Sequence, residues 1–474
     1  MDANLSKPAA TTYVADRALL PGGWTDHAVL EVLEDGTFGV VRDGTAGADA
    51  TRIAGVVVPG VPNVHSHAFQ RGLAGRAEKG DAVVDDFWGW RSVMYRFLHQ
   101  LAPEDVEALA AQLYVEMLES GYTAVAEFHY LHRDQSGVAY ADPLEMSRRI
   151  INAAEAAGIR TTLLPTVYMR AGFDDGLLEG GQKRFRMDPV SVVESIAELE
   201  GSHAGPLLHL GLGLHSLRAV GLGDIRRAIA GLSSLGTTSG QVARPIHMHV
   251  AEQTGEVRAA LRWVGGRPVD YLLDHVDVDA QWCLIHATHL TESELRRLAS
   301  SGATVGLCPT TEANLGDGLF RIPDYQLASG SWAVGSDSQI SVSPVAELRM
   351  LEYGQRLRLR ARNVSSQNGG GGRSTGRALL DQAWAGGARA LGQRIGAIAT
   401  GHGADLVVLD PDHPALVGLE SDGLLDGWVF SGERSPVRRV MVGGRWRVDD
   451  GQHARRAEIL DRFNATMKRL SRTA

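Results

Sequence analysis

Cysteine, lysine and long hydrophobic runs are all scarce in this chain of 474 residues. Cys283 and Cys308 are its two cysteines. Both lie in apolar, strand-like runs, so a disulfide framework is excluded and we expect two buried free thiols. Of the 47 basic residues only four are lysine, and a single arginine in so arginine-rich a chain is weak evidence of a site. No apolar run reaches the roughly 20 residues that cross a bilayer, and no basic, apolar leader opens the sequence, so we expect a cytoplasmic protein without membrane contact.

Basic charge is also in deficit. The net charge is −9 at pH 7, and no block of basic residues stands out. This balance argues against nucleic acid or an anionic membrane as a partner, and an anionic ligand would need a local basic cluster. The length exceeds what one ordinary hydrophobic core supports, but it suits an α/β barrel with a satellite domain.

From residue 56 onward, apolar strands alternate with amphipathic helices. This alternation predicts a parallel sheet, and eight strands in a row indicate a closed (β/α)8 TIM barrel. The Gly- and Ser-rich segment 363–377 interrupts the pattern, and its composition predicts a mobile surface loop. The eight predicted strands lie at 53–58, 123–130, 161–169, 207–218, 244–252, 282–289, 303–311 and 331–339.

Both ends of the chain have short strand patterns, and Asp35-Gly36 near the start is typical of a hairpin turn. We therefore predict an α/β fold with a small β-sandwich domain built from both chain ends. The predicted domains are the small β domain at 1–55 and 395–450, the barrel at 56–394, and a C-terminal helix within 451–474.

The stretch Pro59–Gln70, PGVPNVHSHAFQ, is the centre of the predicted site. His65 and His67 lie two residues apart, just past the predicted strand 53–58, so in an extended chain both imidazoles point to the same side. Neutral imidazole is a good ligand for divalent metals, and catalytic zinc usually takes three protein ligands and leaves one position for water. The alternative is that both histidines are solvent-facing loop residues.

Polar residues also gather at the ends of the other predicted strands, where the catalytic groups of TIM barrels lie. This clustering favours a metal site over loop histidines. The residues are Glu127 to Tyr130, His215, Arg218, His247, His249, Glu252, His286, His289 and Asp337.

Four motifs, in this order along the chain, resemble the amidohydrolase superfamily, in the branch that keeps a single metal and deaminates. They are HSH (65–67), HVAE (249–252), IHATH (285–289) and GSDS (335–338). Further stretches, PNVHSHAFQRGLAGR, FWGWRSVMY, AEFHYLH, GLHSLRAV and HVAEQ, are similar to the members that hydrolyse N-formimino-L-glutamate to N-formyl-L-glutamate and ammonia in histidine breakdown. The resemblance implies one divalent metal ion, with Zn²⁺ favoured and Fe²⁺ or Mn²⁺ open, and a small dicarboxylate substrate.

Beside this resemblance, His65, His67 and His249 are expected to be neutral metal ligands, with Asp337 as the fourth. His247 remains an alternative ligand on the same strand face as His249, one layer deeper in the barrel, or a core histidine.

Three residues are expected to do the chemistry. Asp337 would accept a proton from the attacking water, and His286 would steady the attacking oxygen and the tetrahedral centre. Glu252 would protonate the substrate nitrogen and the departing ammonia. The alternative for Glu252 is a carboxylate favoured at the start of the helix near Thr254.

The substrate's two carboxylates need paired donors, and arginine binds carboxylates through two parallel hydrogen bonds. The resemblance assigns Arg91, Arg218 and Tyr130 to the carboxylates, with His215 in the same stretch as Arg218, and Gln70 to the formimino end. Arg91 could instead be a surface arginine in a loop rich in aromatic residues.

Other residues and functions stay open. Trp88 and Trp90 are expected to pack that loop, and His129, His132 and His289 are structural candidates. One competing function is a deaminase of the cytosine, guanine or adenosine type, and another is a non-catalytic barrel that serves as a scaffold. The small β domain and the exposed helices suit a homodimer, which we expect.

Overall fold

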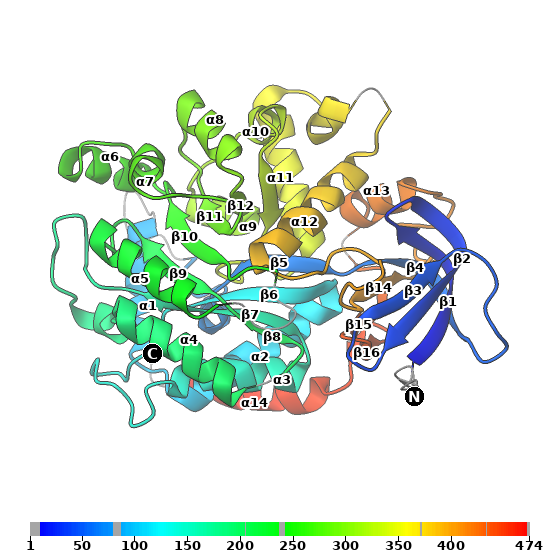
Figure 1. Cartoon of the computed structure of the whole chain (residues 1–474), viewed down its shortest axis with the longest axis horizontal. Coiled ribbons are helices and arrows are strands. Elements are labelled where there is room, and N and C mark those ends of the chain that lie inside the picture. The colour runs from blue at the N-terminus through cyan, green and yellow to red at the C-terminus, as the bar shows by residue number, and fades with distance from the viewer. Residues whose placement is uncertain are drawn as a thin grey trace, which may run out of the picture.

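The computed structural model describes residues 10–78, 87–203, 205–236, 242–369, 372–432 and 434–471. A barrel surrounded by helices occupies the larger part of the molecule, and a separate sheet built from both chain ends lies beside it (Figure 1). The prediction of a TIM barrel with a small β domain is confirmed.

Eight parallel strands line the barrel, and each neighbours the next in chain order. The ring closes between its first and last strands, because the main-chain N–H of Asp337 donates to the carbonyl of His65 (3.0 Å) and that of His67 donates to the carbonyl of Asp337 (3.2 Å). The strands are β5 (Val61–Ser66), β6 (Tyr122–His129), β7 (Arg160–Val167), β9 (Leu212–Ser216), β10 (Ile246–Val250), β11 (Trp282–His286), β12 (Thr304–Leu307) and β13 (Ser331–Val334).

The first barrel strand is not the one predicted. The run 53–58 lies in β4 (Thr51–Pro59), which pairs in parallel with β1 (Ala10–Leu20) and antiparallel with β14 (Leu406–Leu409) of the second sheet. After Gly60 the chain continues directly into β5, which is buried but contains Asn63, His65 and Ser66, so no apolar run marked it as a strand. His65 therefore lies within a strand and not past its end.

Two other predicted segments differ in detail. The strand expected at 207–218 is divided into β8 (Leu208–Leu210), which pairs with the start of β7, and β9, which pairs with its end. In the predicted loop 363–377, residues 364–369 form a short 3₁₀ helix and a long helix begins at Thr375. Residues 370 and 371 of that loop lie outside the described residues.

Helices cover the outside of the barrel (Figure 1). Their ends follow local rules: α2 begins at Pro103, whose missing N–H costs nothing there, and stops at Gly121, which takes the left-handed conformation (φ 104°). The helices are α1 (Phe87–Leu98), α2 (Pro103–Ser120), α3 (Glu145–Ala157), α4 (Pro189–Ser202), α5 (Leu222–Ser234), α6 (Thr254–Trp263), α7 (Pro268–His275), α8 (Glu292–Ser301), α9 (Pro309–Leu315), α10 (Ile322–Leu327), α11 (Pro344–Leu359) and α12 (Thr375–Leu391).

The small domain is one mixed sheet in the order β17-β16-β15-β14-β4-β1-β2-β3. The predicted hairpin is present, with Gly36 at φ 79° and the Asp35 carboxylate accepting the N–H of Thr37. A separate apolar cluster joins side chains of both chain ends, among them Leu30 and Leu406. The remaining strands are β2 (Gly23–Leu33), β3 (Phe38–Arg42), β15 (Val437–Val442), β16 (Arg445–Asp449) and β17 (Gln452–His453).

Two more helices follow β14. α13 (Gly423–Phe430) packs against α11 and α12, and α14 (Arg456–Leu470), the predicted C-terminal helix, packs against α2 of the barrel. The domain boundaries at 55, 394 and 450 stay predictions.

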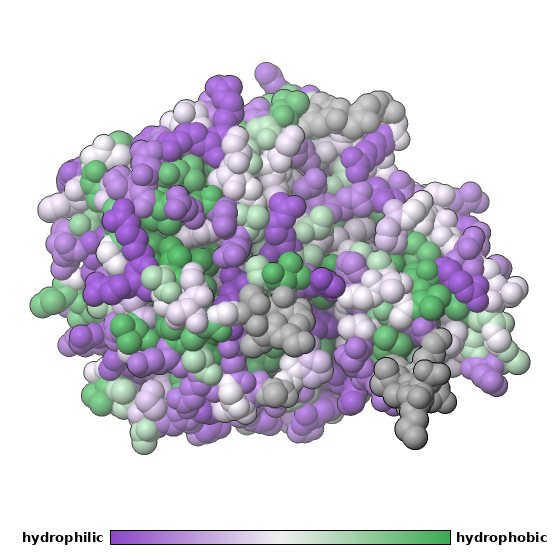
Figure 2. Space-filling model, in the orientation of Figure 1, coloured by the Kyte–Doolittle hydropathy of each residue, from purple (hydrophilic) through white to green (hydrophobic). Residues whose placement is uncertain are grey.

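Cys283 and Cys308 are both buried and free, as expected. Hydrophilic side chains are spread over the face seen in Figure 2, with smaller groups of hydrophobic ones between them. Within the described part of the chain, no helix combines the length and the apolar character that a membrane span requires.

Candidate active site

Three histidines and one aspartate converge at the C-terminal end of the barrel. His65 comes from β5, His67 from the residue directly after it, His249 from β10, and Asp337 from the turn after β13. Nε2 of His249 lies 3.0 Å from Nε2 of His65. Oδ1 of Asp337 lies 3.5 Å from Nε2 of His65 and 3.5 Å from Nε2 of His67. The structure thus brings the four predicted metal ligands together.

Hydrogen bonds on the far side of two rings set the direction of their lone pairs. Nδ1 of His67 donates to the carbonyl of Phe128 (2.9 Å), and Nδ1 of His249 donates to the carbonyl of His215 (2.8 Å). A carbonyl only accepts, so Nδ1 carries the hydrogen and Nε2 keeps its lone pair. Both lone pairs therefore face the shared centre.

These spacings fit a metal ion. Nitrogen and oxygen donors about 2.1 Å from a tetrahedral Zn²⁺ lie roughly 3.4 Å apart, close to the separations above. His247, the alternative ligand, does not take part: its Nε2 faces the carbonyl of Ala390 on α12 (2.7 Å), so it is a core histidine.

Burial keeps the three clustered histidines neutral. It lowers the pKa of His67 to about 3 and holds the pKa values of His65 and His249 well below the usual range. Burial also raises the pKa of Asp337 to about 7, against the opposing effect of His286. A divalent cation held by these groups would favour the neutral imidazoles and the ionised carboxylate.

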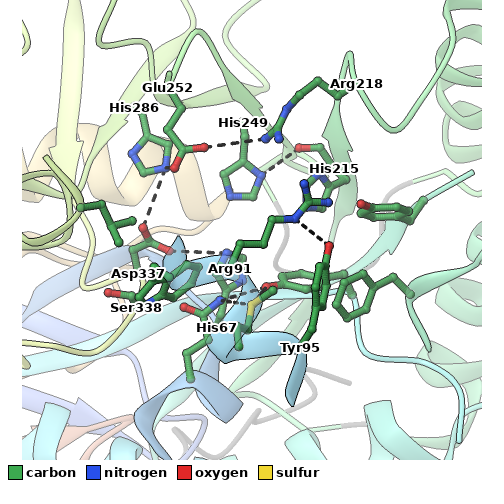
Figure 3. A pocket seen from close by; sticks show the side chains of 17 residues that line it. His67, Arg91, Tyr95, His215, Arg218, His249, Glu252, His286, Asp337 and Ser338 are labelled. Atoms are coloured by element: carbon green, nitrogen blue, oxygen red, sulfur yellow. Dashed lines mark hydrogen bonds and ion pairs between the residues drawn. The ribbon is translucent and has the colours of Figure 1, made fainter. Parts of the chain in front are cut away.

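The predicted acid and the predicted oxygen-binding histidine lie beside this cluster (Figure 3). Nε2 of His286 is 3.9 Å from Oε1 of Glu252 and 3.8 Å from Oδ2 of Asp337. Burial opposes the charged form of His286, but Glu252, Glu312 and Asp337 outweigh it and raise its pKa to about 10. In this arrangement His286 can donate a hydrogen bond toward the centre.

The main chain is strained where these side chains leave the strands. His286 has φ 67° and Asp337 has φ 46°, a left-handed conformation that residues other than glycine seldom adopt. Such strain persists only where the surroundings hold it, and it gathers at functional sites. At Asp337 the two closing hydrogen bonds of the barrel supply that support.

A pocket opens above the four predicted metal ligands. Arg218 reaches Glu252 through Nη2 (3.8 Å to Oε2), and Arg91 donates from Nε to the hydroxyl of Tyr95 (2.6 Å) (Figure 3). Gln70 donates to the hydroxyl of Tyr130 (2.9 Å). The lining residues are His67, Gln70, Trp90, Arg91, Met94, Tyr95, Tyr130, Tyr168, Phe185, His215, Arg218, His249, Glu252, His286, Leu315, Asp337 and Ser338.

All the predicted site residues except His65 line this pocket, and His65 is fully buried beneath it. The roles assigned to them stay predictions. The buried oxygen of Gln70, Oε1, has no hydrogen-bond partner among the described residues. Since a buried acceptor rarely stays unpaired, a donor on a ligand is a natural partner for it.

The surroundings of Arg91 differ from those predicted. Arg91 lies on helix α1 and not in a loop, and Trp90, expected to pack, forms part of the pocket wall. The side chain of Trp88 lies outside the described residues. Two of the remaining histidines are structural: His132 bonds to the carbonyl of Thr166 (3.0 Å) and stacks edge-on with His129.

Sequence reasoning missed several polar residues at the site, among them Tyr95, Tyr168 and Glu312. Tyr95 lines the pocket beside Arg91, and Glu312 bonds to Nδ1 of His286 (3.2 Å). Tyr95 could have been found once FWGWRSVMY was recognised as a helix, because it lies one turn after Arg91. Glu312 lies on α9, five residues after β12 ends at Leu307, and carries no pattern that distinguishes it from a surface acid.

Known proteins match nearly the whole chain. A sequence model described as "Amidohydrolase family" matches residues 56–447. A protein of Pseudomonas aeruginosa named formimidoylglutamate deiminase is 48% identical, covering 93% of this chain and 95% of its own. The same organism's 8-oxoguanine deaminase is 28% identical over 84% of this chain and 83% of its own.

Solved structures match equally far. The crystal structure of an amidohydrolase from Brucella melitensis has a TM-score of 0.89 and 43% identity, covering 97% of this chain and 99% of its own. An adenosine deaminase from Xanthomonas campestris, solved with bound zinc, has a TM-score of 0.79 over 99% of this chain and all of its own, and at 20% identity it shows a shared fold alone.

Proposed function

This chain belongs to the amidohydrolase family, and we propose that it hydrolyses N-formimino-L-glutamate to N-formyl-L-glutamate and ammonia. The relative from Pseudomonas aeruginosa that bears the name formimidoylglutamate deiminase supports this activity at 48% identity over nearly the full length of both chains. The observation that carries the proposal is one pocket with a cluster of candidate metal-binding side chains at its floor and two arginines, Arg91 and Arg218, in its wall.

The metal would be held by His65, His67, His249 and Asp337. Three imidazoles and one carboxylate suit Zn²⁺, which we propose as the resident ion, and Fe²⁺ and Mn²⁺ accept the same donors. A bound divalent cation lowers the pKa of water from 15.7 to about 7, which amidine hydrolysis at neutral pH requires.

Three side chains, those of Asp337, His286 and Glu252, would carry out the proton transfers and hydrogen bonding of the reaction. Asp337 accepts a proton from the attacking water, and His286 donates a hydrogen bond to the attacking oxygen. The carbon–oxygen bond forms at the formimino carbon, and the bond from that carbon to its terminal nitrogen breaks. Glu252 passes protons to that nitrogen, so both hydrogens of the water leave with it as ammonia.

The substrate's carboxylates would be bound at the other end of the pocket. Arg91 and Arg218 offer forked donors for them, with Tyr130 and His215 beside them. Burial, together with Arg218, keeps the pKa of His215 well below its usual range, so His215 is neutral and adds no charge. The open Oε1 of Gln70 can accept an N–H of the formimino group.

The competing function is deamination of a nucleobase or nucleoside. It is supported by the relative named 8-oxoguanine deaminase at 28% identity. Such a ligand has no carboxylates, so it would offer no matching acceptors to the forked donors of Arg91 and Arg218. The two arginines therefore favour the dicarboxylate.

Ammonia release decides between the two functions. Purified protein is incubated with N-formimino-L-glutamate and, in parallel, with cytosine, guanine and adenosine, and its metal content is measured on the same sample. We expect ammonia from the first compound alone and about one divalent ion per chain, since the cluster offers one complete set of donors. Ammonia release from a nucleobase or nucleoside alone would contradict the proposal and support the competing function.

Two further expectations remain proposals drawn from the sequence. A homodimer is tested by light scattering of the purified protein, and a cytoplasmic location by fractionation of the producing cells.

A further inference from the structure

The ring of His286 is held from the side that faces away from the reaction centre. Its Nδ1 lies 3.2 Å from Oε1 of Glu312, while its Nε2 edge faces Asp337 and Glu252 at 3.8 Å and 3.9 Å. His286 and Glu312 are only 1% and 3% exposed. The imidazole therefore lies between one carboxylate behind it and two in front of it.

Glu312 is itself fixed in place. It lies on α9, and its Oε1 also accepts the main-chain N–H of Cys308 (2.9 Å) at the end of β12. It is not among the described residues that line the pocket. Glu312 can therefore influence the reaction through His286 but not by touching a bound substrate.

This bond determines how His286 presents its other nitrogen. A carboxylate oxygen accepts and cannot donate, so the Nδ1 hydrogen points at Glu312. Turning the ring would break this bond and leave a buried donor and a buried acceptor unpaired. The strained main chain at His286 fixes where the side chain starts, and Glu312 fixes where the ring points.

We propose that Glu312 is a positioning residue that holds the imidazole of His286 with its Nε2 edge toward the reaction centre. The proposal rests on the hydrolysis proposed above and deepens it. At metal sites, carboxylates that orient a metal-ligating histidine in this way matter by about 10- to 100-fold in metal affinity or activity, and Glu312 makes the same kind of bond to a histidine beside the proposed ligands.

The test compares two buried carboxylates of the same region. Glu347 on α11 is fully buried and accepts hydrogen bonds from the N–H and the hydroxyl of Thr310, but no described bond joins it to His286. The variants are Glu312→Ala, Glu312→Gln and the matched control Glu347→Ala, all loaded with zinc. If Glu312→Ala does not fold, Glu312→Asp takes its place. The aspartate side chain is one methylene shorter, so we expect the same loss of kcat.

Steady-state kinetics with N-formimino-L-glutamate provide the first measurement. We expect Glu312→Ala to lower kcat by about 10- to 100-fold with KM and zinc content unchanged. Glu312→Gln should restore most of kcat, because its amide oxygen still accepts the Nδ1 hydrogen. Glu347→Ala should keep kcat even where its unfolding midpoint falls. Equal kcat losses in Glu312→Ala and Glu347→Ala would reduce Glu312 to a structural role and overturn the proposal.

Nuclear magnetic resonance of zinc-loaded protein labelled with ¹⁵N-histidine provides a measurement that needs no substrate. We expect a protected Nδ1–H signal of His286, assigned by its loss in His286→Asn, that disappears in Glu312→Ala and persists in Glu312→Gln and Glu347→Ala. Persistence of the signal in Glu312→Ala would overturn the proposal. If the wild-type protein releases no ammonia from N-formimino-L-glutamate, the proposed function fails, and this spectrum still decides whether Glu312 holds the ring.

Discussion

Nη2 of Arg218 and Oε2 of Glu252 face each other in the pocket at 3.8 Å (Figure 3). Under the proposed function, Arg218 binds a substrate carboxylate and Glu252 transfers protons to the substrate nitrogen. Glu252 and Glu256 outweigh the effect of burial and raise the pKa of Arg218, so the guanidinium stays charged. A substrate carboxylate arriving at Arg218 competes with Glu252 for the same forked donors. Under the proposed function, binding of the dicarboxylate would thus weaken the interaction of Arg218 with Glu252.

Replacing Arg218 by methionine tests this arrangement. Charge-assisted hydrogen bonds are worth about 1.5–3 kcal/mol, and 1.4 kcal/mol is a factor of ten. We expect KM for N-formimino-L-glutamate to rise about tenfold or more, as measured by ammonia release. Arg186→Met, at an exposed arginine next to the pocket residue Phe185, is the control and should leave KM unchanged. An unchanged KM in Arg218→Met would remove Arg218 from the substrate site.

Glu252→Gln separates proton transfer from binding. The amide keeps the size of the side chain but cannot deliver a proton, and general acid–base catalysis contributes typically 10²- to 10⁴-fold. We expect kcat to fall by about that range while KM and metal content hold. A loss of metal with an unchanged kcat per bound ion would instead make Glu252 a support of the metal site.

Residues at strand ends could be predicted from the sequence, because the C-terminal ends of parallel strands meet at one end of a barrel. His249, His286 and Asp337 were found in this way. Glu312 was not, because its role depends on the direction in which the ring of His286 turns, and no spacing along the chain encodes that direction.

Among the elements, the closure between β5 and β13 carries the metal site. Asp337 is hydrogen-bonded by its main chain to both His65 and His67, so the strand pairing itself sets the distance between ligands. Gly335 makes the approach possible: a Cβ there would lie 2.7 Å from the main-chain nitrogen of His65 and 2.9 Å from its carbonyl oxygen.

Gly335→Ala should therefore disturb the metal site without removing any ligand. The added methyl group meets main chain and cannot be avoided by turning a side chain, so the two strands must separate. We expect lower metal content and a lower unfolding midpoint, measured by elemental analysis and thermal scanning. Gly223→Ala on α5, where nothing lies within 4 Å of the new Cβ, should leave both unchanged. Full metal content in Gly335→Ala would show that the closure tolerates the added volume.

The order of helices and strands could be predicted where amphipathic helices alternate with strands. The prediction failed where that alternation is absent. β4 and β5 are consecutive strands separated only by Gly60, and the apolar run 53–58 lies wholly in β4, so it marked the last strand before the barrel and not the polar-rich first strand within it. Helix α1 was taken for a loop rich in aromatic residues, and its packing against the pocket is a tertiary effect.

At the scale of the molecule, the barrel and the small sheet are joined by a buried ion pair as well as by the chain. Arg160, the first residue of β7, donates from Nε and Nη2 to both oxygens of Asp405, which precedes β14 (2.7 Å and 3.0 Å). Asp405 also accepts the N–H of Gly443 beyond β15 (2.7 Å). One carboxylate thus connects a barrel strand to two segments of the small domain.

Asp405→Ala should destabilise the whole molecule, because it removes the carboxylate that pairs with the Arg160 guanidinium, and the side chain of Arg160 is only 7% exposed. Removing one partner of a buried pair costs about 3–5 kcal/mol, whereas an exposed pair contributes about 1 kcal/mol or less. The matched control is Asp26→Ala, which breaks the exposed pair with Arg17. Urea unfolding followed by tryptophan fluorescence should show a large loss of stability for Asp405→Ala and little for Asp26→Ala. Similar small losses in both would mean that apolar packing, and not this ion pair, holds the two parts together.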